Sequence, residues 1–359
     1  MRTDKRSVKS LVASGTLVVA ASLLMAPLSA AQTLPAALVV VIVEKSGPVL
    51  GIIDPVAGKL VARVPTGEEP HIVAVSDDGR LAFVDNTDTD GLSIIDVAAR
   101  KEIRRVNVGK GAQPADIHFV DGMVYFTASG WRAIGRYDPK LGTIEYFGLG
   151  QGGPDAITFS KDRKTIYAAN PDSDNISILE NIGGRDWTVT VVPVSKGQRP
   201  EDIEVSPDGR ELWTINELGG GVSIVNLATK VSQNFNLQTK HANRMRFTPD
   251  GRRVLILDRD TGEMVVVDAA SRKVATRVKF TGDKPGESMS VGNLMVMADG
   301  SRAYLTVNAR GLPNSNIERP TGTNPGGRHY IAVIDLKTLA VTSRIDTLFG
   351  NGMACAGCR

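Results

Sequence analysis

A short apolar segment that ends in a polar residue recurs along the chain at an almost constant spacing. Its seven copies read VLGIID, LSIID, IGRYD, ISILE, VSIVN, MVVVD and IAVID. They end at Asp54, Asp96, Asp138, Glu180, Asn226, Asp268 and Asp335, which gives intervals of 42, 42, 42, 46, 42 and 67 residues. A fixed period of this length is typical of stacked supersecondary units. The chain is therefore predicted to be a repeat protein of seven units.

Each unit reads as four short strands joined by tight turns. In residues 203–237 the strand segments are IEVSP, LWTIN, VSIVN and VSQNFNL, with PDG and GG turns between them. Their content of valine, isoleucine, threonine and aromatic residues favours strands and hairpins. In the PDG turn, proline fixes φ, aspartate caps the backbone and glycine takes a positive φ. The polar residue that ends the third strand is predicted to form an Asx turn, and so to be structural.

The two ends of the chain complement each other. The C-terminal segment GMACAG supplies a first strand, and ALVVVIVEK, VLGIID and LVARVPT near the N-terminus supply the other three. Repeated four-stranded sheets that cannot bury their faces alone form propellers, and pairing of the ends leaves no open edge. The sequence predicts an all-β fold, a seven-bladed β-propeller of four-stranded antiparallel blades. N-terminal strands that pair with a C-terminal strand are predicted to close it.

Residues 1–31 have the three parts of a signal peptide. Basic residues precede an apolar run, and Ser29, Ala30 and Ala31 offer a cleavage site before Gln32. An uncleaved membrane anchor is the alternative. We expect an exported, periplasmic protein with a single propeller domain at 32–359 and no stable membrane insertion after cleavage. The interval of 67 residues in blade six predicts a surface-loop insertion at about 309–329.

Loss of the signal peptide leaves a chain without net charge. The sequence carries 42 basic and 39 acidic residues, and the first 31 residues contain four of the basic and one of the acidic ones. A neutral surface gives no general electrostatic reason to bind nucleic acid or anionic lipid. No nucleic-acid partner is therefore predicted.

The repeat resembles the YVTN-type seven-bladed β-propeller family. The resembling segments are WTIN (213–216), YAAN (167–170) and YLTVN (304–308), with SPDGR (206–210) and TPDGR (248–252) ahead of two of them. The resemblance covers nearly the whole chain after the signal peptide. It implies the propeller architecture and a bacterial surface or periplasmic protein. It does not imply an activity, because relatives include lactone-hydrolysing and cofactor-carrying propellers as well as proteins without assigned chemistry.

The innermost strands carry an unusual number of charged residues. In a propeller the first strand of each blade lines the central channel, and every second residue of a strand faces the same side. We number the blades from the one whose first strand lies near residue 72. One set of residues, such as Ile117 and Ile203, is expected to pack between blades. The other set is expected to face the channel and contains Asp116, His118, Asp202, Glu204, Arg244 and Arg246.

Two interpretations of these charges stay open. Charges that leave water need partners, so the carboxylates of blades two and four can pair with the arginines of blade five. Alternatively, Arg244 and Arg246 hold a small polar or anionic ligand, because guanidinium groups bind carboxylate or phosphate bidentately. The 309–329 loop is either a lid over the channel mouth or a solvated decoration. Weaker candidates at the mouth are His71, Asp155, Glu201, His241 and Asn243.

A metal-dependent hydrolase is an alternative function. Asp116, His118, Asp202 and Glu204 offer ligands for a hard divalent ion, which would polarise a lactone carbonyl and activate water. The nearby arginines oppose a cation. The sequence has no G-x-S-x-G elbow, no H-E-x-x-H and no phosphate-binding glycine loop. These observations favour a non-catalytic protein over an enzyme without deciding between them, and no residue is assigned as a metal ligand.

The two cysteines, Cys355 and Cys358, form a C-x-x-C pair at the C-terminus. No histidine follows them, which excludes c-type haem attachment. In an oxidising compartment a local disulfide is expected, and it closes too small a loop to stabilise the fold strongly. A redox role is a further interpretation. Copper is another, because Met353 and the two cysteines are soft ligands that suit Cu(I).

These observations together predict an exported binding or interaction protein. Its partner is expected to be another protein or a small polar or anionic ligand at the channel mouth. The alternatives are a metal-dependent, lactonase-like hydrolase and an accessory protein of a periplasmic redox or quinoprotein system. No cofactor is predicted, and a divalent metal or copper enters only with these alternatives.

Overall fold

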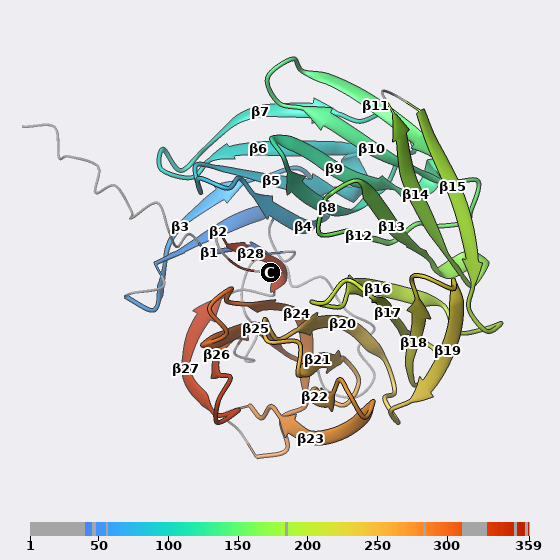
Figure 1. Cartoon of the computed structure of the whole chain (residues 1–359). Helices are drawn as coiled ribbons and strands as arrows, with labels where there is room; N and C mark the ends of the chain where they lie inside the picture. Colours follow the sequence, from blue (N-terminus) through green and yellow to red (C-terminus); the bar gives the residue numbers. More distant parts are fainter. Residues whose placement is uncertain are drawn as a thin grey trace, which may run out of the picture. The chain divides into compact units, whose positions relative to one another are not determined.

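Short strands joined by tight turns make up nearly all of the described chain. The computed structural model describes residues 40–44, 48–54, 57–183, 186–282, 285–310, 329–347, 350–355 and 358. Within these residues, 28 strands form seven four-stranded antiparallel sheets (Figure 1). The predicted signal peptide, its cleavage site before Gln32 and residues 311–328 of the predicted insertion lie outside them. No helix of the described part is long and apolar enough to span a bilayer.

Blades one to three follow one another along the chain. Blade one comprises β4 (Pro70–Val75), β5 (Leu81–Asn86), β6 (Gly91–Asp96) and β7 (Lys101–Asn107). Blade two comprises β8 (Pro114–Val120), β9 (Met123–Ala128), β10 (Ala133–Asp138) and β11 (Thr143–Gly148). Blade three comprises β12 (Ala156–Phe159), β13 (Thr165–Asn170), β14 (Asn175–Gly183) and β15 (Asp186–Pro193). Short 3-10 helices join the second and third strands: η1 (Thr87–Thr89), η2 (Ser129–Trp131) and η3 (Pro171–Ser173).

Blades four to seven repeat the same order of strands. Blade four comprises β16 (Pro200–Val205), β17 (Glu211–Asn216), β18 (Gly221–Asn226) and β19 (Val231–Asn236). Blade five comprises β20 (Ala242–Phe247), β21 (Arg253–Asp258), β22 (Glu263–Asp268) and β23 (Lys273–Lys279). Blade six comprises β24 (Met289–Val296), β25 (Arg302–Ala309), β26 (His329–Asp335) and β27 (Val341–Thr347). Blade seven comprises β28 (Gly350–Cys355), β1 (Val40–Glu44), β2 (Val49–Asp54) and β3 (Lys59–Pro65).

The innermost strands contact one another in a closed cycle. Contacts run from β4 through β8, β12, β16, β20, β24 and β28 back to β4. Apolar side chains that were expected to pack between blades are buried in the inter-blade clusters, among them Ile117 and Ile203. The prediction of a seven-bladed propeller is confirmed. In blade six, the second strand β25 ends at Ala309 and the third strand β26 begins at His329.

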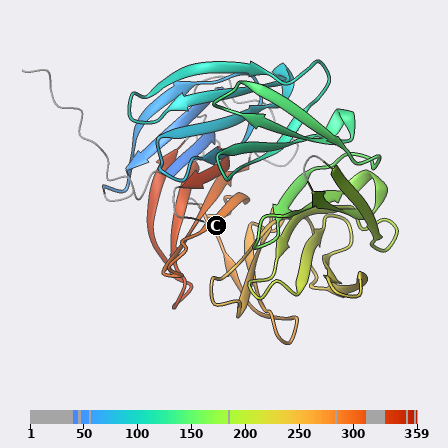
Figure 2. The same ribbon diagram turned by 45° about the horizontal axis from the view of Figure 1, so that its top comes forward.

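Pairing of β28 with β1 closes the ring, as predicted. Val40 lies opposite Cys355, and Ile42 lies opposite Met353. The side chains of Ile42, Met353 and Cys355 are buried. Both views show β28 beside β1, although the two strands come from opposite ends of the chain (Figure 1, Figure 2). The pairing satisfies the backbone of β1 on the side that β2 leaves free, so blade seven has no open inner edge there.

The recurring polar residues of the turns are structural. At the end of the third strand, Asp96 accepts a hydrogen bond from the Ala99 N–H at 2.8 Å, and the same Asx turn occurs at Asp54, Asp138, Asn226, Asp268 and Asp335. In the PDG turn, Asp208 accepts from the Ser206 hydroxyl at 2.6 Å and from the Arg210 N–H at 3.0 Å. These two bonds lower the pKa of Asp208. The predicted capping role of these residues is confirmed.

The innermost strands contain β-bulges that the sequence did not predict. The register shifts between Pro114 and Ile117 in blade two, and equivalent shifts occur in blades one, four, five and six. A polar side chain of the second strand accepts the hydrogen bonds that the bulge leaves free. In blade two the Thr127 hydroxyl accepts from the N–H groups of Ala115 and Asp116. The bulges matter for function because the charged residues of the wall lie at them or directly after them.

Candidate functional site

A cavity of about 490 Å³ runs along the innermost strands. All six residues that were predicted to face the channel contribute to its wall: Asp116, His118, Asp202, Glu204, Arg244 and Arg246. Ile117 and Ile203 of the other set border the cavity as well, so the six charged residues are distinguished by their chemistry. What each of them does depends on its partners, which differ from one residue to the next.

Asp116 joins blade two to blade three. One carboxylate oxygen accepts from the N–H of Ile117, and the other accepts from the N–H of Ile157 in β12, both at 2.9 Å. His118 Nε2 lies 3.1 Å from the same second oxygen. Burial alone would raise the pKa of Asp116, but His118 and the Ile157 N–H outweigh it and hold that pKa at about 2. The residue is an ionised link between blades.

Asp202 joins blade four to blade five in the same way. Its carboxylate accepts from the Ile203 N–H at 3.0 Å and from the Met245 N–H of β20 at 2.7 Å. Arg246 donates at 3.0 Å to the same Asp202 oxygen that accepts the Met245 N–H, and it also donates to the Met245 carbonyl. Because every one of these partners belongs to the wall itself, the self-compensating interpretation describes Asp202 and Arg246.

Glu204 and Arg244 differ in how tightly they are held. Glu204 accepts from the Phe247 N–H at 2.8 Å, which is a further link to blade five. Arg244 donates to the Asn243 carbonyl at 2.7 Å, but the nearest carboxylate in an ion pair with it, that of Glu201, is 3.7 Å away. Among the six predicted wall residues, Arg244 is the one whose pairing leaves room for a ligand.

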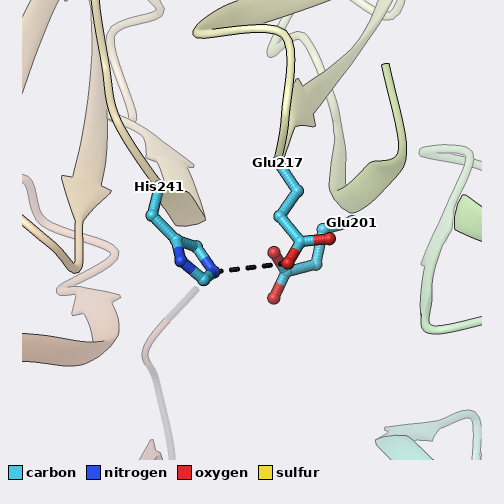
Figure 3. Close-up of side chains that lie close together, drawn as sticks. All are labelled: Glu201, Glu217 and His241. Carbon is cyan, nitrogen blue, oxygen red and sulfur yellow. Dashed lines mark ion pairs between the residues drawn. The ribbon is translucent and has the colours of Figure 1, made fainter. Parts of the chain in front are cut away.

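A cluster of titratable groups lies at the end of the channel where the innermost strands begin, which we call the mouth. Glu201 lies near the start of β16, Glu217 directly follows β17, and His241 directly precedes β20 (Figure 3). His241 Nε2 is 3.4 Å from Glu217 Oε1, and ligand atoms of all three residues lie within 4.8 Å of one another. Glu201 and His241 were predicted at the mouth. Glu217 was missed.

The surroundings of Glu201 disfavour its charged form. Its Oε2 is buried and has no hydrogen-bond partner in the described part of the chain. Burial raises its pKa to about 8, and the carboxylates of Asp155 and Glu217 add to the shift while Arg244 opposes it. Burial likewise raises the pKa of Asp155 to about 6. At neutral pH, Glu201 is therefore mainly protonated, because its pKa lies above the solution pH.

Two arginines of the mouth differ sharply in their pairing. Arg199 donates to Glu217 at 2.8 Å and to Asp172 at 3.0 Å. Arg259, directly after β21, has no carboxylate within 4.0 Å among the described residues, and burial lowers its pKa. Arg310, at the start of the blade-six insertion, donates to the backbone carbonyl of Arg259. The insertion therefore begins beside the mouth. The predicted lid would be formed by residues 311–328, which lie outside the described residues.

The remaining predicted residues lie elsewhere or are occupied. His71 Nδ1 is 2.8 Å from the Ala115 carbonyl oxygen and links blades one and two. Asn243 donates to the Gly292 carbonyl at 2.9 Å and links blades five and six. Cys355 and Cys358 form the expected disulfide, which fits an exported protein. The signal peptide itself stays a prediction.

The raised pKa of Glu201 gives a prediction for stability against pH. An unfolded glutamate has a pKa of about 4.3. Since the folded value is about 8, the folded state binds more protons in this window and loses stability as pH rises through it. We expect the unfolding free energy to fall between pH 5 and pH 9, and Glu201→Gln to reduce that fall by at least about 1 kcal/mol. Urea unfolding at several pH values measures it, with the exposed Glu68→Gln as control. An equal fall in both variants contradicts the assignment.

Comparison with known proteins identifies the fold and no family. No family model matches the sequence, and no curated protein matches it. A protein from Lactobacillus plantarum is similar in structure, with a TM-score of 0.68 and 14% identity over 89% of this chain and 99% of that one. A putative 6-phosphogluconolactonase from Bacteroides fragilis has a TM-score of 0.66 and is 16% identical over 90% of this chain and 99% of that one. An inactive variant of virginiamycin B lyase from Staphylococcus aureus, solved with quinupristin, has a TM-score of 0.56. It is 16% identical over 74% of this chain and 92% of that one. The YVTN-type resemblance beyond the fold stays a prediction.

Proposed function

We propose that the protein is an exported binding protein that holds a small anionic ligand, a carboxylate or a phosphate ester, at the mouth of its channel. The guanidinium of Arg259 carries this proposal. It is partly buried without a carboxylate within ion-pair distance among the described residues, and burial lowers its pKa. A desolvated cation without a close partner gains more from an anion than a surface arginine does.

Two neighbours of Arg259, Arg244 and Glu201, support an anion at this position. Arg244 supplies a second guanidinium, which lies 3.7 Å from Glu201, its ion-pair partner among the described residues. Glu201, with a pKa of about 8, is mainly protonated at neutral pH, so it donates a hydrogen bond to the ligand instead of repelling it. The pair proposed from sequence, Arg244 with Arg246, is replaced by Arg244 with Arg259, because Arg246 is held by Asp202.

Thermal-shift measurements with citrate, phosphate and phosphogluconate test the proposal. We expect at least one of these anions to stabilise the protein by about 2.7 kcal/mol at a concentration of 100 Kd. Arg259→Ala is expected to abolish the shift, and the exposed Arg252→Ala, which lies in the same blade, is expected to retain it. The shift is also expected to weaken above pH 8, where Glu201 ionises. The proposal fails if no anion stabilises the parent protein or if Arg259→Ala responds as the parent does.

A metal-dependent hydrolase is the second candidate, and the group of Glu201, Glu217 and His241 favours it. Two carboxylates and one imidazole within 4.8 Å form a donor set that suits a divalent ion. This group replaces the wall residues considered from sequence, since Asp116, Asp202 and Glu204 accept backbone N–H groups of the next blade. The lactonase name of one structural neighbour gives the candidate its chemistry and, at 16% identity, no further support.

The same measurement separates the two candidates. An anion-binding protein is stabilised by anions in the presence of a chelator and is not stabilised by Mn²⁺ or Zn²⁺. A metal site at the mouth gives the opposite pattern, and His241→Ala removes the response to the metal. Hydrolysis of a simple lactone that depends on the added metal would establish the second candidate in place of the first.

A further inference from the structure

One part of the channel wall carries sulfur where blades two to five carry charge. Met295 of β24, Met353 and Cys355 of β28, and Cys358 all line the cavity. Met297 and Cys358 pack against the apolar cluster that contains the other three. We call these five residues the sulfur wall. It brings blade six together with the C-terminal end of the chain.

Backbone pairing fixes the geometry of the sulfur wall. Met297 and Cys358 form an isolated antiparallel bridge, and Cys358 Sγ lies 3.5 Å from Met297 Sδ. The Cys358 N–H donates to the Cys355 carbonyl at 3.3 Å. Because β28 also pairs with β1, Cys355 is held in the sheet of blade seven. Three sulfur atoms, from Cys355, Cys358 and Met297, are thus held together by two blades.

Access to this group comes from the channel. Cys355 has an exposed fraction of 8%, while Cys358 is only partly buried and borders the cavity. A small reductant that enters the cavity can therefore reach the Cys358 sulfur, which is the sulfur next to Met297. The surroundings are apolar: Ile42, Ile331 and Ile345 belong to the same cluster. An apolar, partly closed environment excludes competing water ligands and favours soft sulfur ligation.

We propose that reduction of the Cys355–Cys358 disulfide converts the sulfur wall into a Cu(I) site. A dithiol donates two electrons and two protons to the disulfide; the S–S bond breaks, two cysteine thiols form, and the dithiol becomes a disulfide. Cu(I) then displaces the two protons and binds both thiolates, with the Met297 thioether as third ligand. Thiolate and thioether ligands select Cu(I) over harder ions. The oxidised form has no thiolate, so the redox state of the pair controls copper binding.

This inference is independent of the proposed function. It uses no residue of the mouth, and anion binding at Arg259 requires neither thiols nor copper. The two proposals therefore fail separately: loss of anion binding leaves the copper site untouched, and the reverse also holds. Met297, which the sequence did not connect to the cysteines, is the residue that distinguishes this site from a bare C-x-x-C pair.

Anaerobic titration of the protein with Cu(I) against bicinchoninate tests the inference. We expect protein reduced with a phosphine to bind one Cu(I), at least about 100-fold more tightly than oxidised protein, because only the reduced form supplies thiolates. Met297→Leu is expected to weaken binding about tenfold, as loss of a supporting metal contact does. Met264→Leu, at a buried site in blade five, is the matched control and is expected to bind as the parent does. X-ray absorption is expected to show a copper shell of sulfur only.

Two results overturn the inference. The first is equal Cu(I) affinity of the reduced and oxidised parent protein, a comparison that needs no variant and so does not depend on whether a variant folds. The second is equal affinity of Met297→Leu and Met264→Leu, which would remove Met297 from the site. The Cys355→Ser/Cys358→Ser variant is expected to lose binding while it keeps the circular-dichroism spectrum of the parent, and retained binding in it also contradicts the proposal.

Discussion

Asp202→Asn is expected to destabilise the protein by about 3–5 kcal/mol, because it leaves the Arg246 guanidinium in the wall without its carboxylate. Asp202 is only 5% exposed, and its two oxygens accept backbone N–H groups from blades four and five as well as the arginine. The neutral amide keeps the shape but removes the charge, and its NH₂ group faces N–H donors that it cannot satisfy. Urea unfolding at 25 °C measures the change.

The control for this prediction is an ion pair at the surface. Asp121 pairs with Arg163, and both side chains are more than half exposed. Asp121→Asn is expected to change the unfolding free energy by at most about 1 kcal/mol. In a double-mutant cycle, Arg246→Met is expected to recover part of the loss caused by Asp202→Asn, since it removes the unpaired charge. An Asp202→Asn protein as stable as the parent would instead identify this carboxylate as a group reserved for a ligand.

Deletion of residues 350–359 is expected to abolish the stable fold. The deletion removes β28, which exposes the backbone of β1 and the buried side chain of Ile42. Its cost is expected to approach the whole unfolding free energy of a domain, about 5–15 kcal/mol. An open edge of this kind also pairs with other chains. We expect aggregated product, measured as the yield of soluble protein and by the loss of a cooperative unfolding transition.

A variant without the disulfide separates the strand from the covalent link. Cys355→Ser/Cys358→Ser keeps β28 and removes only the disulfide. Because this disulfide closes a loop of four residues, chain entropy predicts that its loss costs about 2 kcal/mol of stability. It is therefore expected to remain folded. A synthetic peptide of residues 350–359 is expected to restore soluble protein when it is added to the refolding truncated chain. A truncated protein that unfolds cooperatively near the parent midpoint would show that β28 does not close the ring.

The period of the chain and the polarity of its strands were enough to predict the fold. The spacing of residues such as Asp96 and Asp138 gave the number of blades, and the unmatched strands at the two ends gave the closure. Strand alternation also placed Asp202 and Arg244 on the channel wall. The number of blades could be predicted because it rests on local turn chemistry, which every repeat carries in its own sequence.

The partners of these residues were beyond such reasoning. Asp202 accepts the Met245 N–H across the boundary between blades four and five, and a contact of this kind depends on how neighbouring blades pack. Glu217 and Arg259 follow second strands of neighbouring blades, so their meeting at the mouth depends on the angle between sheets. Both residues directly follow the second strand of a blade, and this shared position in the repeat is the signal by which the sequence identifies them.

The closure by β28 also dictates when the molecule can fold. Val40 is synthesised early and its partner Cys355 late. The edge of β1 therefore stays unpaired until β28 has been synthesised. Contacts between residues this distant in sequence form slowly, and the intermediates that precede them are prone to aggregate. We therefore expect the ring of this protein to close only after its final strand has been synthesised.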